Sequence, residues 1–239
     1  MKPVEGLRIE RRNSTLELQH RHGRWVARKR YHNQYSVESE LAAYARLRAL
    51  AARLPELRVP DCRRSSKDAE LLEIEWLEGP TLRELLMGGQ PGLTPRIETL
   101  ICQLLVACNQ AEGNFDIEPG NLIVLPQQLG VIDPTMLPLS IPHQEPAGFM
   151  LGLLKIGLAR SWSPAVWTRT HHVGQRIARA YCRSANIQPD DLRRSIGAYL
   201  RVVIHWNRQQ AAGERLRLRL ARRLVLIPLY RTIARLCER

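Results

Sequence analysis

Lysine is scarce in this sequence, so each lysine invites inspection. The chain has 36 lysines and arginines against 23 acidic residues, a formal net charge of +13, yet only Lys2, Lys29, Lys67 and Lys155 are lysines. A cationic surplus of this size indicates an anionic partner such as nucleic acid, a membrane surface or a phosphorylated substrate. Apolar residues make up 44% of the 239 residues, which excludes a wholly disordered or collagen-like chain and suffices for a sizeable core.

Other missing features narrow the class of protein further. The five cysteines are odd in number and lack the CxxC or Cys/His spacing of zinc sites, which predicts reduced thiols in a cytoplasmic protein. The N-terminus has no apolar stretch like that of a signal peptide, and no run approaches the roughly 18 apolar residues of a membrane-spanning helix. No recognition-helix, RNA-binding or zinc-finger pattern accompanies the positive charge, which disfavours nucleic acid as the partner.

The first third of the chain alternates apolar and polar residues, as strands do. Strands are expected at residues 7–10, 15–19, 25–31 and 71–76. Between the third and fourth strands, Ser36 is a candidate N-cap, and Leu41, Tyr44, Leu47 and Leu50 follow at helical spacing. The sequence therefore predicts a small antiparallel sheet with one helix.

Beyond Gly79 the pattern becomes mainly helical. Helices are expected at residues 81–87, 94–109, 149–160, 170–185 and 190–210, with a short hairpin at 122–125 and 129–132. The predicted class is α+β. It comprises a β-rich part with one helix over residues 1–78 and a mainly helical part over residues 79–239.

Lys29 occupies an unusual place for a lysine. In a strand, alternate side chains point to opposite faces, so Lys29 shares a face with Trp25, Ala27 and Tyr31, whereas Arg28 and Arg30 point the other way. Taken alone, Lys29 is more simply interpreted as one further surface cation in an arginine-rich strand. Its position among apolar residues favours a functional role.

Lys29 is the first of four polar features that follow one another in a fixed order. Glu40 lies early in the next helix, Asp116 and Asn121 precede the first strand of the hairpin, and Asp133 follows the second strand. Each feature alone is weak, because Asp-x-x-x-x-Asn spacing arises by chance and Asp133 before a proline is typical of a turn. Glu38 competes with Glu40, which is preferred because Tyr44 continues its face of the helix.

This arrangement resembles the protein-kinase-like fold, in particular the lipopolysaccharide-kinase and aminoglycoside-phosphotransferase families. The segment FDIEPGNLIV is similar to their catalytic loop, GVIDPT to their metal-binding turn, and LLEIEWLEGPTL to the strand and hinge that join their two lobes. The resemblance covers roughly residues 7–133. It implies an ATP-dependent phosphotransferase that uses Mg²⁺.

The resemblance also implies a role for each matching residue. Lys29 would contact the α- and β-phosphates of ATP, and Glu40 would pair with its ammonium. Asp116 would orient or deprotonate the acceptor hydroxyl, while Asn121 and Asp133 would supply oxygen ligands to Mg²⁺. Ser14 in the loop between the first two strands, with Glu75 and Leu77 at the hinge, would complete the nucleotide site.

Three departures separate this chain from the family pattern. Residues 11–15 contain no glycine where the family's nucleotide loop does, and Asn114 stands where a histidine usually braces the catalytic loop. Glu118 occupies the position of a phosphate-contacting lysine in protein kinases, which argues against a typical protein kinase. A catalytically inactive kinase-like binding module is therefore the alternative to an active enzyme.

The positive charge gathers at the two ends of the chain. Residues 214–239 contain eight arginines and two glutamates, mixed with leucine, valine and isoleucine. This composition suits a helix lying on the anionic inner membrane, or equally a C-terminal helix packed on the core with a solvated basic face. A basic, peripheral kinase favours a sugar or glycolipid acceptor, such as the lipopolysaccharide core, over the cationic substrates of the aminoglycoside group.

Overall fold

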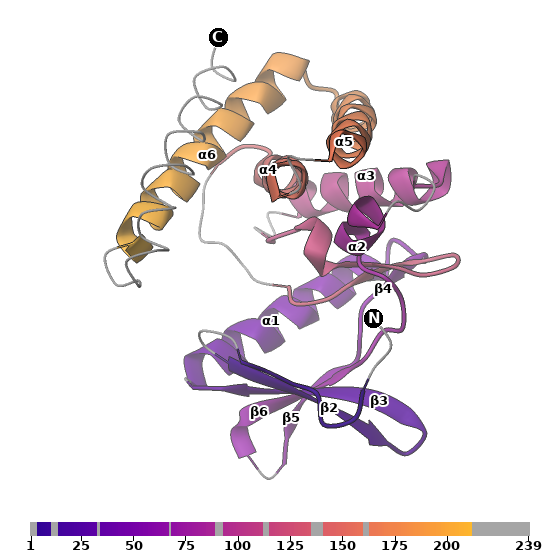
Figure 1. Ribbon diagram of the computed structural model, residues 1–239, viewed down its shortest axis with the longest axis vertical. Coiled ribbons are helices and arrows are strands. Elements are labelled where there is room, and N and C mark those ends of the chain that lie inside the picture. Colours follow the sequence, from indigo (N-terminus) through magenta and orange to yellow (C-terminus); the bar gives the residue numbers. More distant parts are fainter. Residues whose placement is uncertain are drawn as a thin grey trace.

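The computed structural model describes residues 4–10, 14–32, 34–66, 68–88, 93–111, 115–134, 141–159 and 163–211. An antiparallel sheet with one long helix forms one end of the molecule, and a group of helices forms the other (Figure 1). The α+β class and this division into a β-rich N-terminal part and a helical C-terminal part are confirmed.

The N-terminal sheet has five strands in the order β1-β2-β3-β6-β5, all neighbours antiparallel. These strands are β1 (Arg8–Glu10), β2 (Ser14–Arg21), β3 (Arg24–Tyr31), β5 (Cys62–Ser65) and β6 (Asp68–Glu75). His22 and Gly23 join β2 to β3, both with positive φ (50° and 76°), as a two-residue type I′ turn requires. Because β3 is central, its alternate side chains face into the molecule.

Helix α1 (Gln34–Ala51) packs against this sheet. Val37, Tyr44 and Leu47 are buried, which confirms the predicted apolar face of the helix. The helix begins at Gln34, so the expected start at Ser36 was wrong by two residues. The apolar periodicity that marks the helix starts only at Val37, and the first turn before it therefore carries no sequence signal.

Two of the predicted helix starts in the second half are confirmed by their caps. Thr81 accepts from the Glu84 N–H at 3.0 Å in a capping box at the start of α2 (Leu82–Met87). Thr94 accepts from the Ile97 N–H at 3.4 Å at the start of α3 (Pro95–Gln110). Both threonines satisfy backbone donors that the first helical turn leaves without partners.

A second, three-stranded sheet has the order β4-β8-β7. The hairpin of β7 (Leu122–Val124) and β8 (Leu129–Val131) follows a short 3₁₀ turn, η1 (Pro119–Asn121). The third strand, β4 (Leu57–Arg58), comes from the stretch after α1 and runs parallel to β8. Long-range pairing of two residues has no local sequence signature, so β4 was not predicted.

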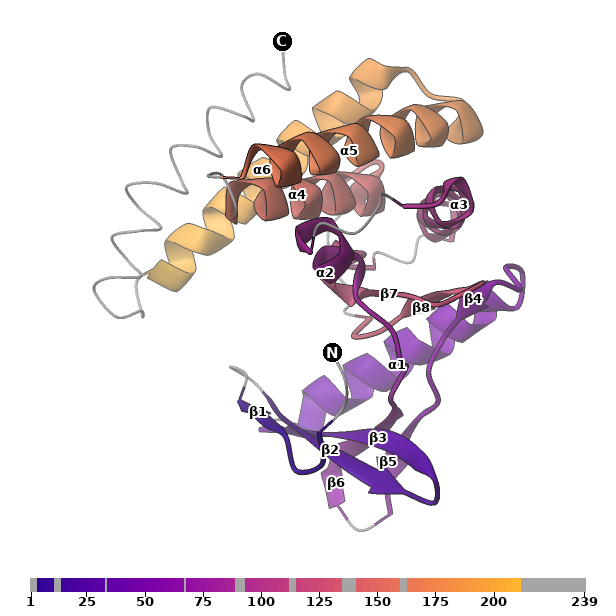
Figure 2. The same ribbon diagram turned by 45° about the vertical axis from the view of Figure 1, so that its right-hand side comes forward.

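Three long helices complete the C-terminal part: α4 (Gln144–Ala159), α5 (Pro164–Ala185) and α6 (Pro189–Ala211) (Figure 2). The sequence placed the start of α4 five residues too late and that of α5 six too late. The first turn of α4 buries Gln144 and Glu145, whose polarity hides the helical pattern. Helix α5 begins with Pro164, a residue suited to the first helical position.

Several sequence expectations concern residues outside those that the structure describes. They are the glycine-free segment at residues 11–13, Asn114 and the basic stretch 214–239. Cys62, Cys102, Cys108 and Cys182 are free thiols. Within the described ranges, none of the helices has the length and apolar character needed to cross a bilayer.

Candidate active site

The candidate active site centres on the ammonium of Lys29. Its Nζ donates to Glu40 Oε2 at 2.6 Å and to Asp133 Oδ1 at 2.6 Å. Lys29 is 6% exposed and Glu40 8% exposed. A lysine so deeply buried requires paired carboxylates, because an uncompensated charge in this position would cost several kcal/mol, on the order of 3–5.

The elements that hold these groups come from distant parts of the chain. The strand period turns Lys29 to the buried face of β3, with Ala27 and Tyr31, and the first two turns of α1 bring Glu40 above it. Glu38, the competing carboxylate, lies on the exposed face of α1 and pairs with Arg64 instead. Because Glu38 and Glu40 are two residues apart on a helix, their side chains point to different faces.

Asp133 reaches the same point from the end of β8. It adopts a left-handed backbone conformation with φ of 51°, which is uncommon for residues other than glycine and occurs often at functional sites. Its backbone N–H donates to Tyr44 Oη at 3.3 Å, and Tyr44 lies one helical turn after Glu40 on α1. Burial raises the pKa of Tyr44 well above its ordinary value, so the phenol stays protonated.

The catalytic-loop candidates lie close to Asp133. Asn121 ends η1, and its carbonyl accepts from the Ile132 N–H at 2.9 Å, immediately before Asp133. The hairpin register pairs Leu122 with Val131, which brings Asn121 and Asp133 to the same end of the two strands. The Asn121 N–H closes the loop on the Glu118 carbonyl at 2.9 Å.

Asp116 lies before this turn in a largely buried environment. Burial raises its pKa to about 6, with a further contribution from Glu118; Lys155 lowers it, and Asp133 raises it. The electrostatic influence of Asp133 shows that the two carboxylates share one region of the molecule. A carboxylate with this pKa is able to accept a proton near neutral pH, as a general base must.

A narrow cleft lies beside Lys29, between the two parts of the molecule. Its volume is about 70 Å³, and its lining includes Ala27, Lys29, Leu77, Ile123 and Asp133. Trp76 also lines it, and the buried indole N–H of this residue has no hydrogen-bond partner within the described ranges. Apolar walls with one polar edge and a cation suit a planar base followed by phosphates.

The two predicted hinge residues both line this cleft. Leu77 contributes an apolar side chain, whereas the Glu75 carboxylate is engaged by Arg58, whose Nη2 donates to both of its oxygens at 2.6 and 2.7 Å. Asp61 N–H donates to the same carboxylate at 3.1 Å. The backbone N–H of Glu75 also donates to the Asp61 carbonyl at 2.7 Å, so both its carboxylate and its N–H are engaged within the protein.

Ser14 is the one predicted nucleotide contact that lies apart. It is buried at the start of β2 and pairs in register with Tyr31, two residues beyond Lys29 along β3. Leu16, not Ser14, lines the cleft from β2. The structure thus groups Lys29, Glu40, Asp133, Glu75 and Leu77 around one cleft, whereas Asn121 and Asp116, on the segment before β7, are not among its lining residues.

Sequence reasoning missed the partner of Glu118. Lys155 on α4 donates to Glu118 Oε1 at 2.5 Å, so the loop position held by a lysine in protein kinases has a lysine bound to it from another helix. Gly152, one turn earlier on α4, permits this approach, because a Cβ there would lie 2.4 Å from Pro119 Cδ. The scarcity of lysines was the only sequence signal for Lys155.

The oxygen-bearing residues fit a Mg²⁺ ion of the kinase type. Asn121 and Asp133 offer an amide and a carboxylate oxygen, the hard ligands that Mg²⁺ prefers. Lys29 carries one positive charge between two carboxylates, so a further cation would balance the excess negative charge. In the part of the chain that the structure describes, no group of three or more His, Cys, Asp or Glu could by itself hold a metal ion.

Comparison with known proteins assigns this chain to no family. No protein-family model matches the sequence, and no curated protein matches it. Among solved structures, the chain is similar to the choline kinase LicA from Streptococcus pneumoniae, with 11% identity and a TM-score of 0.44 over 98% of this chain and 92% of that chain. This likeness is too weak to support a function, so the functional argument depends on the geometry of the site.

Proposed function

We propose that this protein is an ATP- and Mg²⁺-dependent phosphotransferase with an alcohol acceptor. The observation that carries the proposal is the buried Lys29, held at 2.6 Å by both Glu40 and Asp133. A lysine fixed between a helix carboxylate and the carboxylate of a turn at the end of a hairpin is the arrangement that kinase-like enzymes use to align phosphates.

In this proposal Lys29 binds the α- and β-phosphates of ATP. An ammonium has three N–H donors; Glu40 and Asp133 engage two of them, and the third is available to a phosphate oxygen. Asn121 and Asp133 would hold Mg²⁺, which supplies charge neutralisation to the phosphates when bound. Leu77 and Ile123 would contact the base in the cleft, and the Trp76 indole N–H would offer a donor at its edge.

Asp116 is the proposed base. It would accept the proton of the acceptor hydroxyl as the oxygen attacks the γ-phosphorus, the ADP oxygen leaves, and the phosphoryl group transfers in line. Burial and Glu118 keep its proton affinity high, while Lys155 opposes them. This balance places Asp116 close to neutrality, where it can take up a proton and later release it.

A sugar hydroxyl, such as one of the lipopolysaccharide core or a related glycolipid, is the proposed acceptor. A cavity of about 340 Å³ adjoins the catalytic loop and is lined by Glu118, Gly120 and Lys155, with Arg83 from α2. The lining of this cavity thus includes two cations, Arg83 and Lys155, and one carboxylate, Glu118. Because positive charge is in excess, the cavity suits an acceptor that already carries negative charge. The basic segment 214–239 supports a peripheral location at the inner membrane as part of the same proposal.

The decisive experiment measures the transfer of ³²P from Mg²⁺-ATP to a total glycolipid extract. The same assay measures the release of inorganic phosphate. The wild type is expected to transfer phosphate, whereas Asp116→Asn and Asp133→Asn are expected to lose about 100-fold or more in rate. Asn suits position 133 because it also tolerates positive φ. Transfer at the wild-type rate by either folded variant would refute the proposal.

One observation favours a second candidate, a nucleotide-binding module that performs no transfer. Asp133 Oδ1 already contacts Lys29 directly, and the cleft of about 70 Å³ is narrow, so the described arrangement is closed. Such a module would bind ATP in calorimetry and release or transfer no phosphate. The assay above therefore separates the two candidates with a single preparation.

A further inference from the structure

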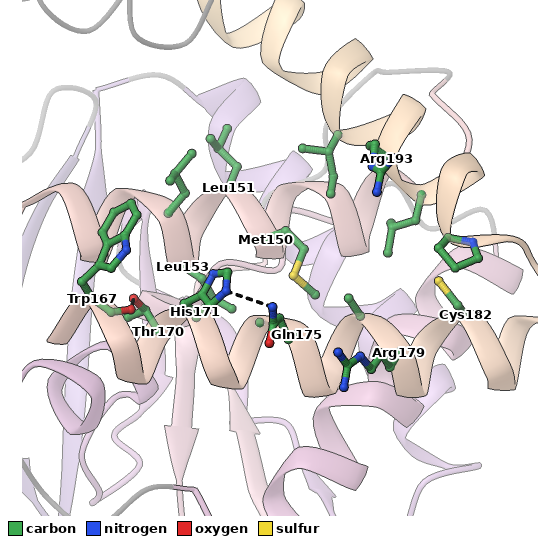
Figure 3. A pocket seen from close by; sticks show the side chains of 16 residues that line it. Met150, Leu151, Leu153, Trp167, Thr170, His171, Gln175, Arg179, Cys182 and Arg193 are labelled. Atoms are coloured by element: carbon green, nitrogen blue, oxygen red, sulfur yellow. Dashed lines mark hydrogen bonds between the residues drawn. The ribbon is translucent and has the colours of Figure 1, made fainter. Parts of the chain in front are cut away.

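A second, larger concavity lies in the helical part of the molecule, between α4, α5 and the start of α6 (Figure 3). We call it the helical groove. Its volume is about 570 Å³, within the range of roughly 300–1,000 Å³ typical of ligand sites. Its floor is formed by Met150, Leu151, Leu153, Leu154, Gly174, Ala178, Cys182, Pro189, Leu192 and Ile196.

Three uncharged or neutral polar side chains of the helical groove have partners within α5. Gln175 Nε2 and His171 Nε2 lie 2.9 Å apart, as the dashed line in Figure 3 marks. The Thr170 hydroxyl donates to the carbonyls of Val166 and Trp167, at 3.0 and 2.9 Å. Most of the remaining lining residues are apolar, so the part of a ligand that enters the groove is expected to be apolar.

The charge of the rim is of one sign. Arg179 on α5 and Arg193 on α6 line the helical groove, and none of its described lining residues is acidic. Arg193 also pairs with Asp190 at 3.1 Å, but both partners are largely exposed and the contact is therefore weak. The rim thus favours an anionic group.

The helical groove is elongated, with an exposed aromatic residue toward one end. Trp167 is 39% exposed and packs over Gly157, while Arg179 lies twelve residues further along α5, about 18 Å of helix. Figure 3 shows the tryptophan toward one end of the groove and the two arginines toward the other. An extended apolar chain with a charged terminus matches this length and polarity.

We propose that the helical groove binds the acyl chain of an anionic lipid, with the charged headgroup at Arg179 and Arg193. The chain's own basic segment 214–239 is a poorer occupant, because its eight arginines would face the two arginines of the rim. An apolar peptide or a second copy of this chain offers no matching anionic group at the rim. Charge complementarity therefore selects the lipid.

The helical groove is separate from the proposed phosphotransfer site. Met150 and Leu154 face the groove, whereas Gly152 and Lys155 face the catalytic loop, on the other side of α4. The lipid-binding proposal therefore does not depend on the proposed phosphotransferase activity, and its test needs no phosphate acceptor.

The test uses full-length protein and dodecyl phosphate below its critical micelle concentration, with binding measured by calorimetry. Dodecyl maltoside is the neutral probe with the same chain, and inorganic phosphate is the anion without a chain. Dodecyl phosphate is expected to bind at least tenfold more tightly than either. Equal affinity for the neutral probe, or no binding of dodecyl phosphate, would overturn the proposal.

Two variants locate the binding. Gly174→Leu fills the groove without a backbone clash, since a Cβ at position 174 lies 3.4 Å from Leu153 Cδ1, an ordinary contact. It is expected to weaken dodecyl phosphate binding at least tenfold while the Tm does not fall. Arg179→Glu combined with Arg193→Glu is expected to abolish the preference for the anionic probe.

Arg183→Glu, on the same helix but outside the lining, is the matched charge control and should retain wild-type affinity. Undiminished binding in folded Gly174→Leu would place the lipid elsewhere. The last measurement compares wild type and Gly174→Leu by analytical sedimentation. If the wild type is a dimer and Gly174→Leu is a monomer, the groove binds a second copy of this chain, and the lipid proposal is overturned.

Discussion

Lys155 on α4 donates to Glu118 in the catalytic loop at 2.5 Å, across 37 residues of sequence. In a protein kinase the corresponding loop position itself carries the cation. Here the loop carries the carboxylate and a neighbouring helix supplies the lysine, so a positive charge still stands beside Asp116. Glu118, the departure that argues against a typical protein kinase, is thus paired with a lysine from another helix.

The first prediction concerns this pair. Lys155→Met is expected to lower phosphate transfer about tenfold or more while changing the unfolding free energy by less than about 1 kcal/mol, because the pair is partly exposed. Exchanging the charges in the double variant Glu118→Lys with Lys155→Glu places the lysine in the loop and should recover activity relative to Glu118→Lys alone. Denaturant unfolding and transfer rates check both parts. Parallel losses of stability and rate would instead assign the pair a structural role.

The second prediction concerns pH. Burial and Glu118 raise the pKa of Asp116 to about 6, so transfer should increase as pH rises through about 6 and the base becomes deprotonated. Lys155 lowers this pKa, so Lys155→Met should move the midpoint to higher pH. Glu118 raises it, so Glu118→Gln should move the midpoint to lower pH. Rate profiles between pH 5 and 9 measure both shifts, and shifts in the opposite directions would contradict the assignment of Asp116 as the base.

The third prediction concerns stability at the same residue. The folded-state pKa of Asp116 is above its unfolded value of 3.8, so the folded protein binds the proton more tightly. The stabilising contribution is fully present below about pH 4 and is lost as pH rises through about 6. Asp116→Asn is therefore expected to be more stable than wild type at pH 8, by at most about 3 kcal/mol, with a smaller difference at pH 5. Urea unfolding at both pH values tests the sign.

The fourth prediction concerns the buried charge group. Lys29→Met removes the cation between Glu40 and Asp133 and should reduce the unfolding free energy by about 3–5 kcal/mol, as well as abolishing ATP binding. Adding Glu40→Leu to this variant removes one of the two carboxylates that have lost the Lys29 ammonium and should restore part of the stability, but not ATP binding. Calorimetric titration with Mg²⁺-ATP separates the two effects; ATP binding at wild-type affinity by the double variant would exclude Lys29 as a phosphate ligand.

The fifth prediction concerns the approach of α4 to the loop. Alanine normally stabilises a helix interior relative to glycine by about 1 kcal/mol. At Gly152 the added Cβ would lie 2.4 Å from Pro119 Cδ, so Gly152→Ala should destabilise the protein and separate Lys155 from Glu118. Gly174→Ala, where the Cβ meets Leu153 at an ordinary 3.4 Å, is the matched control and should be neutral or stabilising. Thermal unfolding should give a lower Tm for Gly152→Ala and an unchanged or higher Tm for Gly174→Ala.

Local patterns were reliable where periodicity is strong. The alternation in β3 predicted that Lys29 shares the buried face with Ala27 and Tyr31, and Thr81 and Thr94 marked two helix starts. Patterns were unreliable where polar residues are buried. Gln144 and Glu145 are buried in the first turn of α4, so apolar periodicity did not indicate the start of that helix. β4 has only two residues and pairs with a strand some seventy residues away.

By itself, the sequence determined the α+β class, most elements of the N-terminal sheet, and the order of the polar residues now proposed for catalysis. These follow from periods of 2 and 3.6 residues and from capping chemistry, which are local properties of the chain. Only the tertiary structure decided that Lys29 contacts both Glu40 and Asp133, that Lys155 of α4 pairs with Glu118, and that α4, α5 and α6 line an apolar groove with two arginines. Such relationships depend on how whole elements pack against one another, and no local pattern encodes them.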